Sequence, residues 1–273
     1  MGDGWSGKTA LITGASAGIG ASFAEFLAGK GLQVIMAARR EERLASLAEK
    51  IHNQGGKAEY FALDLSLPEN RDSLFQEMSR KYQSLDILIN NAGFGWYGYF
   101  YEMPKNLASQ MIAVNMEAVV HLTFLFLKPM LKRGSGHIIN IGSIAGGFPN
   151  QGVALYSATK AFLDAFTTSL HRELRGSGVH ASVMRLGPVE SEFFDAARRA
   201  ENGGSVPAER LAAPVQKVND ALWRLMEKPR RVMYVPGWLR ISRLADPLFG
   251  WLVDRLGPLL LRREKGRPES AAD

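Results

Sequence analysis

Lys8-Thr-Ala-Leu-Ile-Thr-Gly14-Ala-Ser-Ala-Gly18-Ile-Gly20 is the stretch of sequence that decides the fold. It begins with a short apolar run that ends at a glycine, which is typical of a buried strand. The helical spacing of Phe23, Phe26 and Leu27 then predicts a helix. Glycines between a strand and a helix permit a left-handed turn and let a diphosphate approach the backbone. The stretch therefore predicts a dinucleotide site, and the alternative is a tight turn that holds no ligand.

The rest of the chain continues this alternation of strands and helices. Apolar runs predict strands at residues 34–38, 58–63, 86–90, 137–141, 181–186 and 232–235. Helical patterns lie between them, at residues 41–53, 68–82, 104–132, 154–175 and 209–227. Such alternation implies right-handed crossovers, so we expect an α/β fold with one doubly wound parallel sheet of about seven strands and helices on both faces. Ligands of such sheets bind beyond the carboxyl ends of the strands.

The length and composition favour one large domain over two. The chain has 273 residues, of which 46% are hydrophobic, and this is enough for one sizeable core. We expect residues 1–236 to form that domain and residues 237–265 to form a basic amphipathic C-terminal extension. Residues 266–273 are expected to be a disordered tail.

Cysteine and histidine usage excludes several kinds of site. The absence of cysteine excludes disulfides, thiol nucleophiles and thiolate metal sites. The five histidines are scattered without metal-ligand spacing, so no metal site is expected. The N-terminus has no apolar signal core, and no run reaches 18 uncharged apolar residues. We therefore expect a soluble protein made in a cytoplasm.

The net charge of +6 belongs to the C-terminal quarter of the chain. Residues 198–273 hold 15 Arg and Lys against 9 Asp and Glu, whereas the preceding residues balance. No nucleic-acid-binding motif accompanies these charges, so we expect no nucleic acid partner. Trp238 to Leu261 interleaves apolar and charged residues, which excludes a membrane span. This segment fits a lid or a subunit contact, which we favour, or peripheral contact with an anionic membrane surface.

Tyr156-Ser-Ala-Thr-Lys160 contains the candidate acid/base pair. Residues four apart share one face of a helix. A free phenol titrates near pH ~10, and a nearby ammonium group favours the phenolate and lowers that pKa. The pair can therefore act as a general acid/base. The alternative for this spacing alone is a solvated helix face.

The end of the second predicted strand indicates the cofactor. An NAD-preferring enzyme usually places an acidic residue there against the adenosine ribose. This chain instead reads Ala37-Ala38-Arg39-Arg40. Guanidinium groups pair with a 2′-phosphate, so NADP is favoured over NAD. In the alternative, both arginines are solvated and neutralised by Glu41 and Glu42.

Five motifs in order resemble the short-chain dehydrogenase/reductase family over residues 7–235. They are Thr13-Gly-Ala-Ser-Ala-Gly-Ile-Gly20, Asn90-Asn-Ala-Gly93, Asn115, Ser143 and Tyr156-x-x-x-Lys160. The resemblance implies a Rossmann-like fold and an NADP(H)-dependent oxidoreductase that interconverts a ketone or aldehyde and an alcohol. It also implies a homodimer or homotetramer built on the two long helices. A non-catalytic NADP(H)-binding sensor and a membrane-surface scaffold are the alternative functions.

The resemblance also implies a role for each motif residue. Tyr156 would exchange the proton, Lys160 would lower its pKa and bind the nicotinamide ribose, and Ser143 would donate to the substrate oxygen. Asn115 would hold a water that links Lys160 to solvent. Asp64 would meet the adenine amino group, and Asn91 with Gly93 would pack against the adenosine ribose. The full set implied to bind the cofactor, besides Tyr156 and Lys160, is Gly14, Ser16, Ala17, Gly18, Ile19, Gly20, Arg39, Arg40, Asp64, Leu65, Asn91, Ala92, Gly93, Gly187, Val189 and Ser191.

The sequence departs from the family pattern after the sixth predicted strand. It reads Leu186-Gly-Pro-Val-Glu-Ser191, with leucine in place of the usual proline and serine in place of the threonine that holds the carboxamide. Serine keeps the hydroxyl donor, so we expect hydride transfer to survive the change.

Aromatic residues follow three of these motifs. Phe94, Trp96, Phe148 and Phe193 indicate a substrate pocket for a bulky apolar carbonyl or alcohol. Steroid-like, fatty-acyl-derived and aromatic substrates all fit this description. The alternative is that these rings pack the core or a subunit contact.

Overall fold

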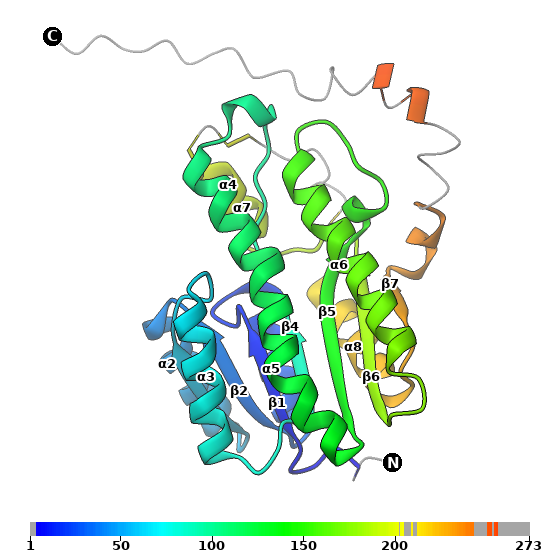
Figure 1. The fold of residues 1–273 in the computed structure, drawn as a ribbon. Coiled ribbons are helices and arrows are strands. Elements are labelled where there is room, and N and C mark those ends of the chain that lie inside the picture. The colour runs from blue at the N-terminus through cyan, green and yellow to red at the C-terminus, as the bar shows by residue number, and fades with distance from the viewer. Residues whose placement is uncertain are drawn as a thin grey trace, which may run out of the picture.

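A parallel sheet forms the centre of the molecule. The computed structural model describes residues 4–201, 203–204, 209, 212–242, 250–252 and 254–255. Its strands are β1 Thr9–Thr13, β2 Gln33–Ala38, β3 Lys57–Ala62, β4 Ile87–Asn90, β5 Gly136–Ser143, β6 Val179–Leu186 and β7 Val232–Val235. Their order across the sheet is β3-β2-β1-β4-β5-β6-β7, and every pairing is parallel (Figure 1). The predicted fold class is therefore confirmed.

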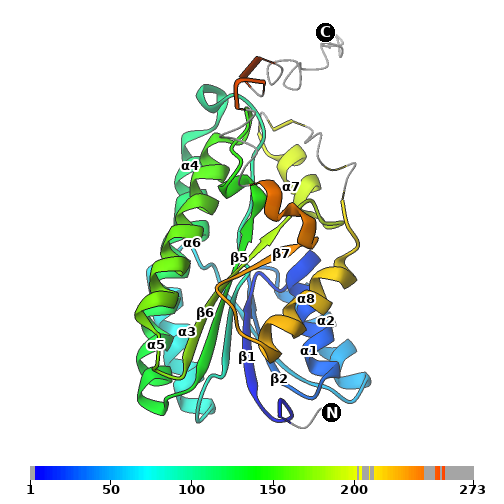
Figure 2. The ribbon, with the colours of Figure 1, turned by 90° about the vertical axis from the view of Figure 1, so that its right-hand side faces the viewer.

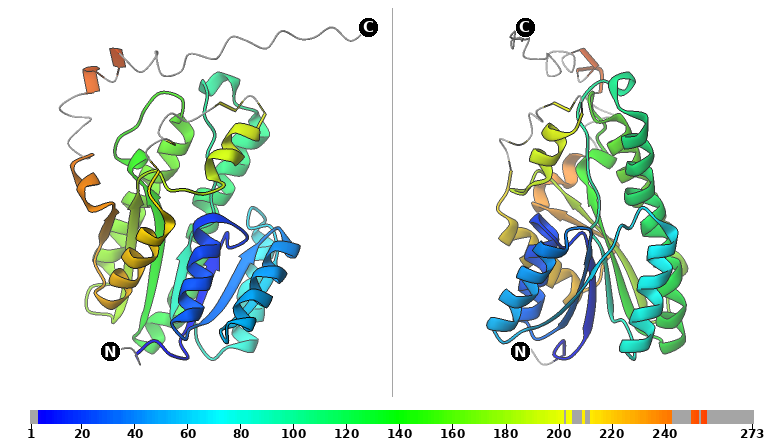
Figure 3. Two further views of the ribbon diagram at one scale, coloured as in Figure 1. Left: turned by 180° about the vertical axis from the view of Figure 1, so that it is seen from behind. Right: turned by 90° about the vertical axis from the view of Figure 1, so that its left-hand side faces the viewer.

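Helices cover both faces of the sheet (Figure 2). One layer contains α1 Gly18–Gly29, α2 Glu41–Asn53 and α8 Val215–Glu227. The other contains α3 Pro68–Lys81, α5 Ala118–Arg133 and α6 Ala154–Glu173. Figure 3 shows α1 and α8 side by side, and residues of the two helices are in contact. Two further helices, α4 Lys105–Ile112 and α7 Phe193–Arg199, lie beyond the carboxyl ends of the strands (Figure 1).

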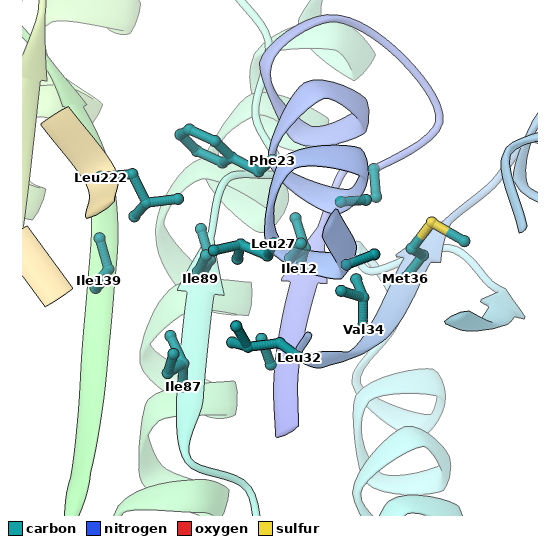
Figure 4. Close-up of a cluster of buried hydrophobic side chains, with 14 of the residues drawn as sticks. Ile12, Phe23, Leu27, Leu32, Val34, Met36, Ile87, Ile89, Ile139 and Leu222 are labelled. Carbon is teal, nitrogen blue, oxygen red and sulfur yellow. The ribbon is translucent and has the colours of Figure 1, made fainter. Parts of the chain in front are cut away.

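The core has two parts because the inner strands of the sheet are buried on both faces. Alternate residues along a strand point to opposite faces. Ile12 and Val34 thus join the cluster under α1 and α8, whereas Leu11 and Ile35 join the cluster under α3, α5 and α6. Figure 4 shows the first cluster, where side chains from two helices meet those of the strands: Ile12, Phe23, Leu27, Val34, Ile89, Ile139 and Leu222.

Three features differ from the sequence-based expectations. The helix predicted over residues 209–227 begins only at Val215, after Pro214, which lies at the N-cap. The loop expected after β6 contains the short helix α7. The long helix predicted over residues 104–132 is interrupted by a turn of π-helix at Ala113–Glu117. The predicted tail at residues 266–273, and most of the extension before it, lie outside the described residues.

The continuous helical segment Lys105–Arg133 is long and apolar enough to cross a membrane by length and composition alone, with mean hydropathy 1.5 in its most apolar window. Its buried side chains Ala118, Leu122, Phe126 and Met130 belong to the second core cluster. The apolar character of the inner face of this segment is therefore explained by packing in the core, although only 39% of the window is buried.

A buried histidine makes the fold sensitive to acid. His137 is 3% exposed, and its Nε2 lies 2.8 Å from the Ser182 hydroxyl. That hydroxyl donates to the Arg230 carbonyl at 2.6 Å, so it accepts from His137 Nε2–H. Burial, followed by the nearby His180 and His171, lowers the pKa of His137 to about 3. The folded state therefore keeps this imidazole neutral where the unfolded chain takes up a proton.

Replacing this histidine should reduce the loss of stability in acid. Between pH 6.5 and about 3 the unfolded chain binds one more proton at His137, so stability falls as pH falls through this window. Each pH unit below 6.5 costs about 1.4 kcal/mol at this site. We expect urea unfolding at pH 7 and pH 5 to show a smaller pH effect in His137→Gln than in wild type. His52→Gln, at an exposed histidine, is the control, and an equal pH effect in both variants would contradict the prediction.

Candidate active site

The glycine-rich turn between β1 and α1 is held against the loop after β4. Gly14 and Gly18 have φ angles of +67° and +55°, in the left-handed region that favours glycine. A Cβ at Gly14 would lie 2.8 Å from the Ala92 Cα. The Asn91 side chain donates to the carbonyl oxygens of Thr13 at 2.9 Å and Gly14 at 3.3 Å. The amide of Asn91 thus shapes the turn, a contact that the ribose role expected for it did not include.

Thr13 is a positioning residue to which the motif assigned no role. Its hydroxyl accepts from the backbone N–H groups of Asn91 at 3.0 Å and Ala92 at 2.9 Å. It donates to the Ile89 carbonyl at 3.3 Å. One hydroxyl therefore joins the end of β1 to the end of β4, directly under the turn.

The first turn of α1 is open to an anion. No side chain caps this helix at Ala17, and its first turn contains no acidic residue. Ser16, Ala17 and Ile19 are all partly exposed. The free N–H groups and the dipole of a helix N-terminus favour a diphosphate. These residues fit a dinucleotide at the place predicted for it.

Three predicted catalytic side chains lie together at the carboxyl end of β5. Ser143 ends that strand, and its hydroxyl lies near enough to the Tyr156 phenol to lower the pKa of the phenol. Tyr156 and Lys160 lie on α6, with Lys160 Nζ 5.7 Å from the centroid of the tyrosine ring. Lys160 Nζ also donates to the Ile141 carbonyl of β5 at 2.8 Å. The fold thus places an ammonium, a phenol and a hydroxyl in one cluster.

Burial sets the protonation of this cluster. It raises the pKa of Tyr156 to about 12, and the hydrogen bond from Ser143 acts in the opposite direction. It lowers the pKa of Lys160 to about 8, against the opposing effect of Asp164. The Lys160 ammonium donates to the Ile141 carbonyl here, and its expected role of lowering the tyrosine pKa stays a prediction. At neutral pH Tyr156 is a neutral phenol with a proton to donate.

Asn115 is fully buried in the π-helical turn between α4 and α5. Its Oδ1 accepts from Phe94 N–H at 3.1 Å, and its Nδ2 donates to the Phe94 carbonyl at 3.0 Å. Nδ2 also donates to Thr159 Oγ1 at 3.2 Å, and this threonine in turn donates to the Tyr156 carbonyl. Asn115 therefore joins the loop after β4 to the catalytic helix. Its burial excludes the alternative that Asn115 is a polar residue inside a helix that faces solvent. The expected role of Asn115 in holding a water stays a prediction.

The sequence matches the short chain dehydrogenase family model over residues 8–202. The chain belongs to the short-chain dehydrogenase family. An uncharacterized oxidoreductase of Staphylococcus saprophyticus is 37% identical over 185 residues, which cover 67% of this chain and 79% of that protein. The 3-oxoacyl-(acyl-carrier-protein) reductase FabG of Vibrio cholerae is 33% identical over 211 residues, covering 76% of this chain and 85% of FabG. The predicted family is confirmed, and this protein is an oxidoreductase of that family.

Solved structures of the family have the same fold. A short-chain dehydrogenase from Sphingobium yanoikuyae in complex with NADPH has a TM-score of 0.78 and 29% identity, covering 97% of this chain and all of the other. A metagenomic short-chain oxidoreductase in complex with NADP has a TM-score of 0.72 and 31% identity, covering 85% of this chain and 96% of the other. The match extends to nearly the full length of both neighbours.

The arginines after β2 lie at the surface of this short-chain dehydrogenase. Arg40 Nε donates to Ser16 Oγ at 3.1 Å, which places its guanidinium beside the glycine-rich turn. Arg40 and Arg43 both pair with Glu192 from the loop after β6, at 3.2 Å and 2.7 Å. The acidic partner is therefore distant in sequence, and it is neither of the adjacent glutamates considered above. Arg39 is exposed and has no ion pair among the residues described.

The two residues after β3 make local contacts. Asp64 Oδ1 accepts from Ser66 N–H at 2.9 Å, and the Asp64 carbonyl accepts from the Asn70 side chain. Leu65 is buried in the second core cluster. The Leu65 side chain thus packs in the core of this short-chain dehydrogenase, and only backbone groups at that position could meet a cofactor. The adenine contact expected of Asp64 stays a prediction.

The segment after β6 reaches back to the glycine-rich turn. Val189 is buried and forms a parallel bridge with Ala213. Ser191 Oγ donates to the Val189 carbonyl at 3.3 Å, and a Cβ on Gly18 would lie 3.1 Å from the Ser191 Cβ. The serine that replaces the family threonine therefore lies against the turn, and its contact with the carboxamide stays a prediction.

Aromatic side chains surround Tyr156 to different degrees. The Phe193 ring lies 5.5 Å from the tyrosine ring, centroid to centroid. Trp96 is buried and its indole N–H donates to the Glu201 carbonyl at 3.0 Å. Phe94 and Phe148 are half-buried and do not line the small pocket beside Tyr156. The side chains around that pocket are largely apolar: Trp96, Phe100, Met103, Met111, Val153 and Leu155.

Proposed function

We propose that this protein is an NADP(H)-dependent oxidoreductase that interconverts an alcohol and a ketone or aldehyde, with Tyr156 as the general acid/base. The observation that supports this most is the clustering of Ser143 with Tyr156 and Lys160, in which the Lys160 Nζ lies 5.7 Å from the centroid of the tyrosine ring. A nucleotide sensor or a scaffold needs only the cofactor site at the glycine-rich turn. It has no use for the cluster of Ser143, Tyr156 and Lys160. Replacing the phenol therefore distinguishes the oxidoreductase from the sensor and the scaffold.

The side chains would divide the chemistry between them. Bound NADPH would supply the hydride. Tyr156, with a pKa of about 12, holds its proton at neutral pH and would give it to the carbonyl oxygen. The Ser143 hydroxyl orients the phenol and would donate to the same oxygen. Lys160 is charged below pH 8 and would stabilise the phenolate that remains, because an adjacent cation favours the anionic form.

The two arginines that follow β2 favour NADP(H) as the cofactor. Arg39 and Arg40 stand where an NAD-preferring enzyme would place an acidic residue. The two neighbours described above, in complex with NADPH and NADP, support this assignment. Guanidinium donors match the oxygens of a 2′-phosphate, and NADH offers a neutral hydroxyl at that position.

Arg39→Ala should weaken NADPH binding by about tenfold or more, because a charged hydrogen bond contributes about 1.5–3 kcal/mol. NADH binding should change little. Fluorescence titrations with both nucleotides would measure the two dissociation constants. Arg172→Ala, at an exposed arginine near the far end of α6, is the control. Equal losses for both nucleotides would show that Arg39 does not contact the phosphate.

A bulky apolar substrate is proposed from the apolar side chains that surround the small pocket beside Tyr156, which would have to widen to admit it. The rings and methionines around it suit a steroid-like, fatty-acyl-derived or aromatic carbonyl compound. The 3-oxoacyl activity in the name of FabG supports the fatty-acyl-derived choice. NADPH oxidation with a panel of such ketones, after titration with NADPH and NADH, tests cofactor and reaction together. Failure of both nucleotides to bind would reject the proposed function.

A homodimer or homotetramer is proposed through the outer faces of α5 and α6. Phe124 on α5 is 66% exposed, and Val120 and Leu131 on the same helix are also exposed. Phe162 and Phe166 stack on α6 with centroids 5.8 Å apart. We expect Phe124→Glu to shift the protein to monomers in sedimentation velocity. Lys57→Glu on the β3 edge should leave the wild-type assembly intact, and an unchanged assembly in Phe124→Glu would contradict the interface.

The extension after residue 236 is proposed to pack on the catalytic domain, residues 1–236. Leu239 is buried, and a Cβ on Gly187 at the end of β6 would lie 2.5 Å from its Cδ1. Trp238 and Ile241 beside it are exposed and available to the rest of the extension or to another subunit. The relatives give no support to a membrane contact, and a cytoplasmic location stays our proposal.

A further inference from the structure

Three consecutive residues after β6 form a strap across the proposed cofactor groove. In this strap, residues 191–193, Ser191 lies against Gly18 of the glycine-rich turn. Glu192 pairs with the arginines at the start of α2. Phe193 packs on Tyr156, 5.5 Å between ring centroids. The backbone of the strap thus links the arginines at the start of α2 to the Tyr156 phenol.

Glu192 is the ionic contact of this strap. Its carboxylate accepts from Arg40 Nη1 at 3.2 Å and from Arg43 Nη1 at 2.7 and 2.8 Å. Arg40 simultaneously donates to Ser16 in the glycine-rich turn. Each of these charged side chains is about half exposed, between 47% and 50%. Exposed ion pairs are weak and screened by salt, so another anion can replace this one.

A phosphate monoester has the chemistry to replace it. A carboxylate brings one charge and two acceptor oxygens to the guanidinium groups. A phosphate monoester brings a charge of about −1.5 to −2 at pH 7 and three acceptor oxygens. A ribose hydroxyl brings no charge, so it cannot compete with Glu192. The 2′-phosphate of NADP(H) can therefore compete with Glu192 for the arginines, and the ribose hydroxyl of NAD(H) cannot.

We propose that Glu192 mimics a phosphate and holds the strap on Arg40 and Arg43 until the 2′-phosphate of an adenosine ligand displaces it. Displacement frees the backbone that joins Glu192 to Phe193, and the aromatic ring leaves Tyr156. The 2′-phosphate thus uncovers the acid/base group as well as being bound. This inference rests on the proposed NADP(H) function and assigns Glu192 as a residue that determines cofactor selectivity.

Calorimetric titration of the full chain with 2′,5′-ADP and 5′-AMP tests the competition. Removing the charge in Glu192→Gln should tighten 2′,5′-ADP by up to about fivefold, the upper end of the range for an exposed ion pair, and leave 5′-AMP unchanged. Glu190→Gln is the matched control, because Glu190 is exposed on the same loop and has no ion pair among the residues described. Unchanged or weaker 2′,5′-ADP binding in Glu192→Gln would overturn the proposal.

Hydrogen exchange of residues 193–199 tests the opening without any turnover. In wild type, 2′,5′-ADP should speed exchange in this segment and 5′-AMP should not. In Glu192→Gln, exchange should already be fast without ligand, and 2′,5′-ADP should add nothing. Equal exchange in all states would overturn the link to Phe193. A wild-type protein that binds neither probe would instead reject the NADP(H) site itself, so the two failures are distinguishable.

Discussion

Tyr156→Phe is expected to lower carbonyl reduction by about 10²–10⁴-fold, the contribution of a positioned general acid, and to leave NADPH binding unchanged. The substitution removes only the hydroxyl. The ring stays on α6, where it packs against Phe193 and faces the Lys160 ammonium. The carbonyl oxygen then receives no proton as the hydride arrives, and water has limited access to this half-buried position.

Steady-state turnover with the best ketone of the panel, together with NADPH fluorescence titration, would measure this effect. Tyr101→Phe is the matched control, because Tyr101 is an exposed tyrosine outside the catalytic cluster. It should retain wild-type turnover. Substantial turnover in Tyr156→Phe would contradict the catalytic assignment, and lost NADPH binding would mean that the phenol has a structural role in the groove.

Asp164→Ala is expected to lower the free energy of unfolding by about 3–5 kcal/mol, the usual loss when one partner of a buried ion pair is removed. Arg185 of β6 is 3% exposed, and its Nε donates to Asp164 Oδ1 at 2.8 Å. Arg185 also donates to the Tyr234 hydroxyl of β7. A guanidinium cannot lose its proton, so removal of the carboxylate leaves a charge buried without its counter-ion. Urea unfolding at pH 7 would measure the loss.

A double variant separates the lost pair from lost packing. Asp164→Leu combined with Arg185→Met removes both charges and should recover most of the stability that Asp164→Ala loses. Asp195→Ala is the control for an exposed pair, since Asp195 bonds Arg198 at the surface, and it should cost less than about 1 kcal/mol. Equal losses in Asp164→Ala and Asp195→Ala would show that burial does not strengthen the inner pair.

Asp164 also links this stability to the catalytic cluster. It lies one helical turn beyond Lys160 on α6, and its charge raises the pKa of that lysine against the effect of burial. The variants that remove the Asp164 charge should therefore move Lys160 further toward its neutral form. Asp164 is a positioning residue for the ammonium group as well as the counter-ion of Arg185.

Most of the sheet was predictable because its inner strands are buried on both faces. Val34-Ile-Met-Ala-Ala38 and Asp86-Ile-Leu-Ile-Asn90 are short, mainly apolar runs, and no packing detail is needed to identify them. Helix α2 was equally predictable, since Leu44, Leu47 and Ile51 repeat at helical spacing. Helix α7, at Phe193–Arg199, is too short to show such a period.

The candidate site was predictable wherever its residues are close in sequence or stand at a recognisable separation. Tyr156 and Lys160 lie four apart on one helix, and the family motif added Ser143 and Asn115. Thr159 was not predicted, because its hydroxyl matters only through the Asn115 amide, 44 residues away. The contact of Glu192 with Arg43 was not predicted either, since 149 residues separate the partners.

The sequence by itself determined the α/β class, the strand and helix order and the family, and it predicted the acid/base pair. These properties follow from local periodicity and from motifs whose residues act on one element or at one sheet edge. Only the tertiary structure decided which charges meet and how far each group is buried. Burial leaves Tyr156 protonated, and Glu192 in the loop after β6 pairs with two arginines near β2. Electrostatic energies depend on distance and solvent exposure, and the order of residues along the chain specifies neither.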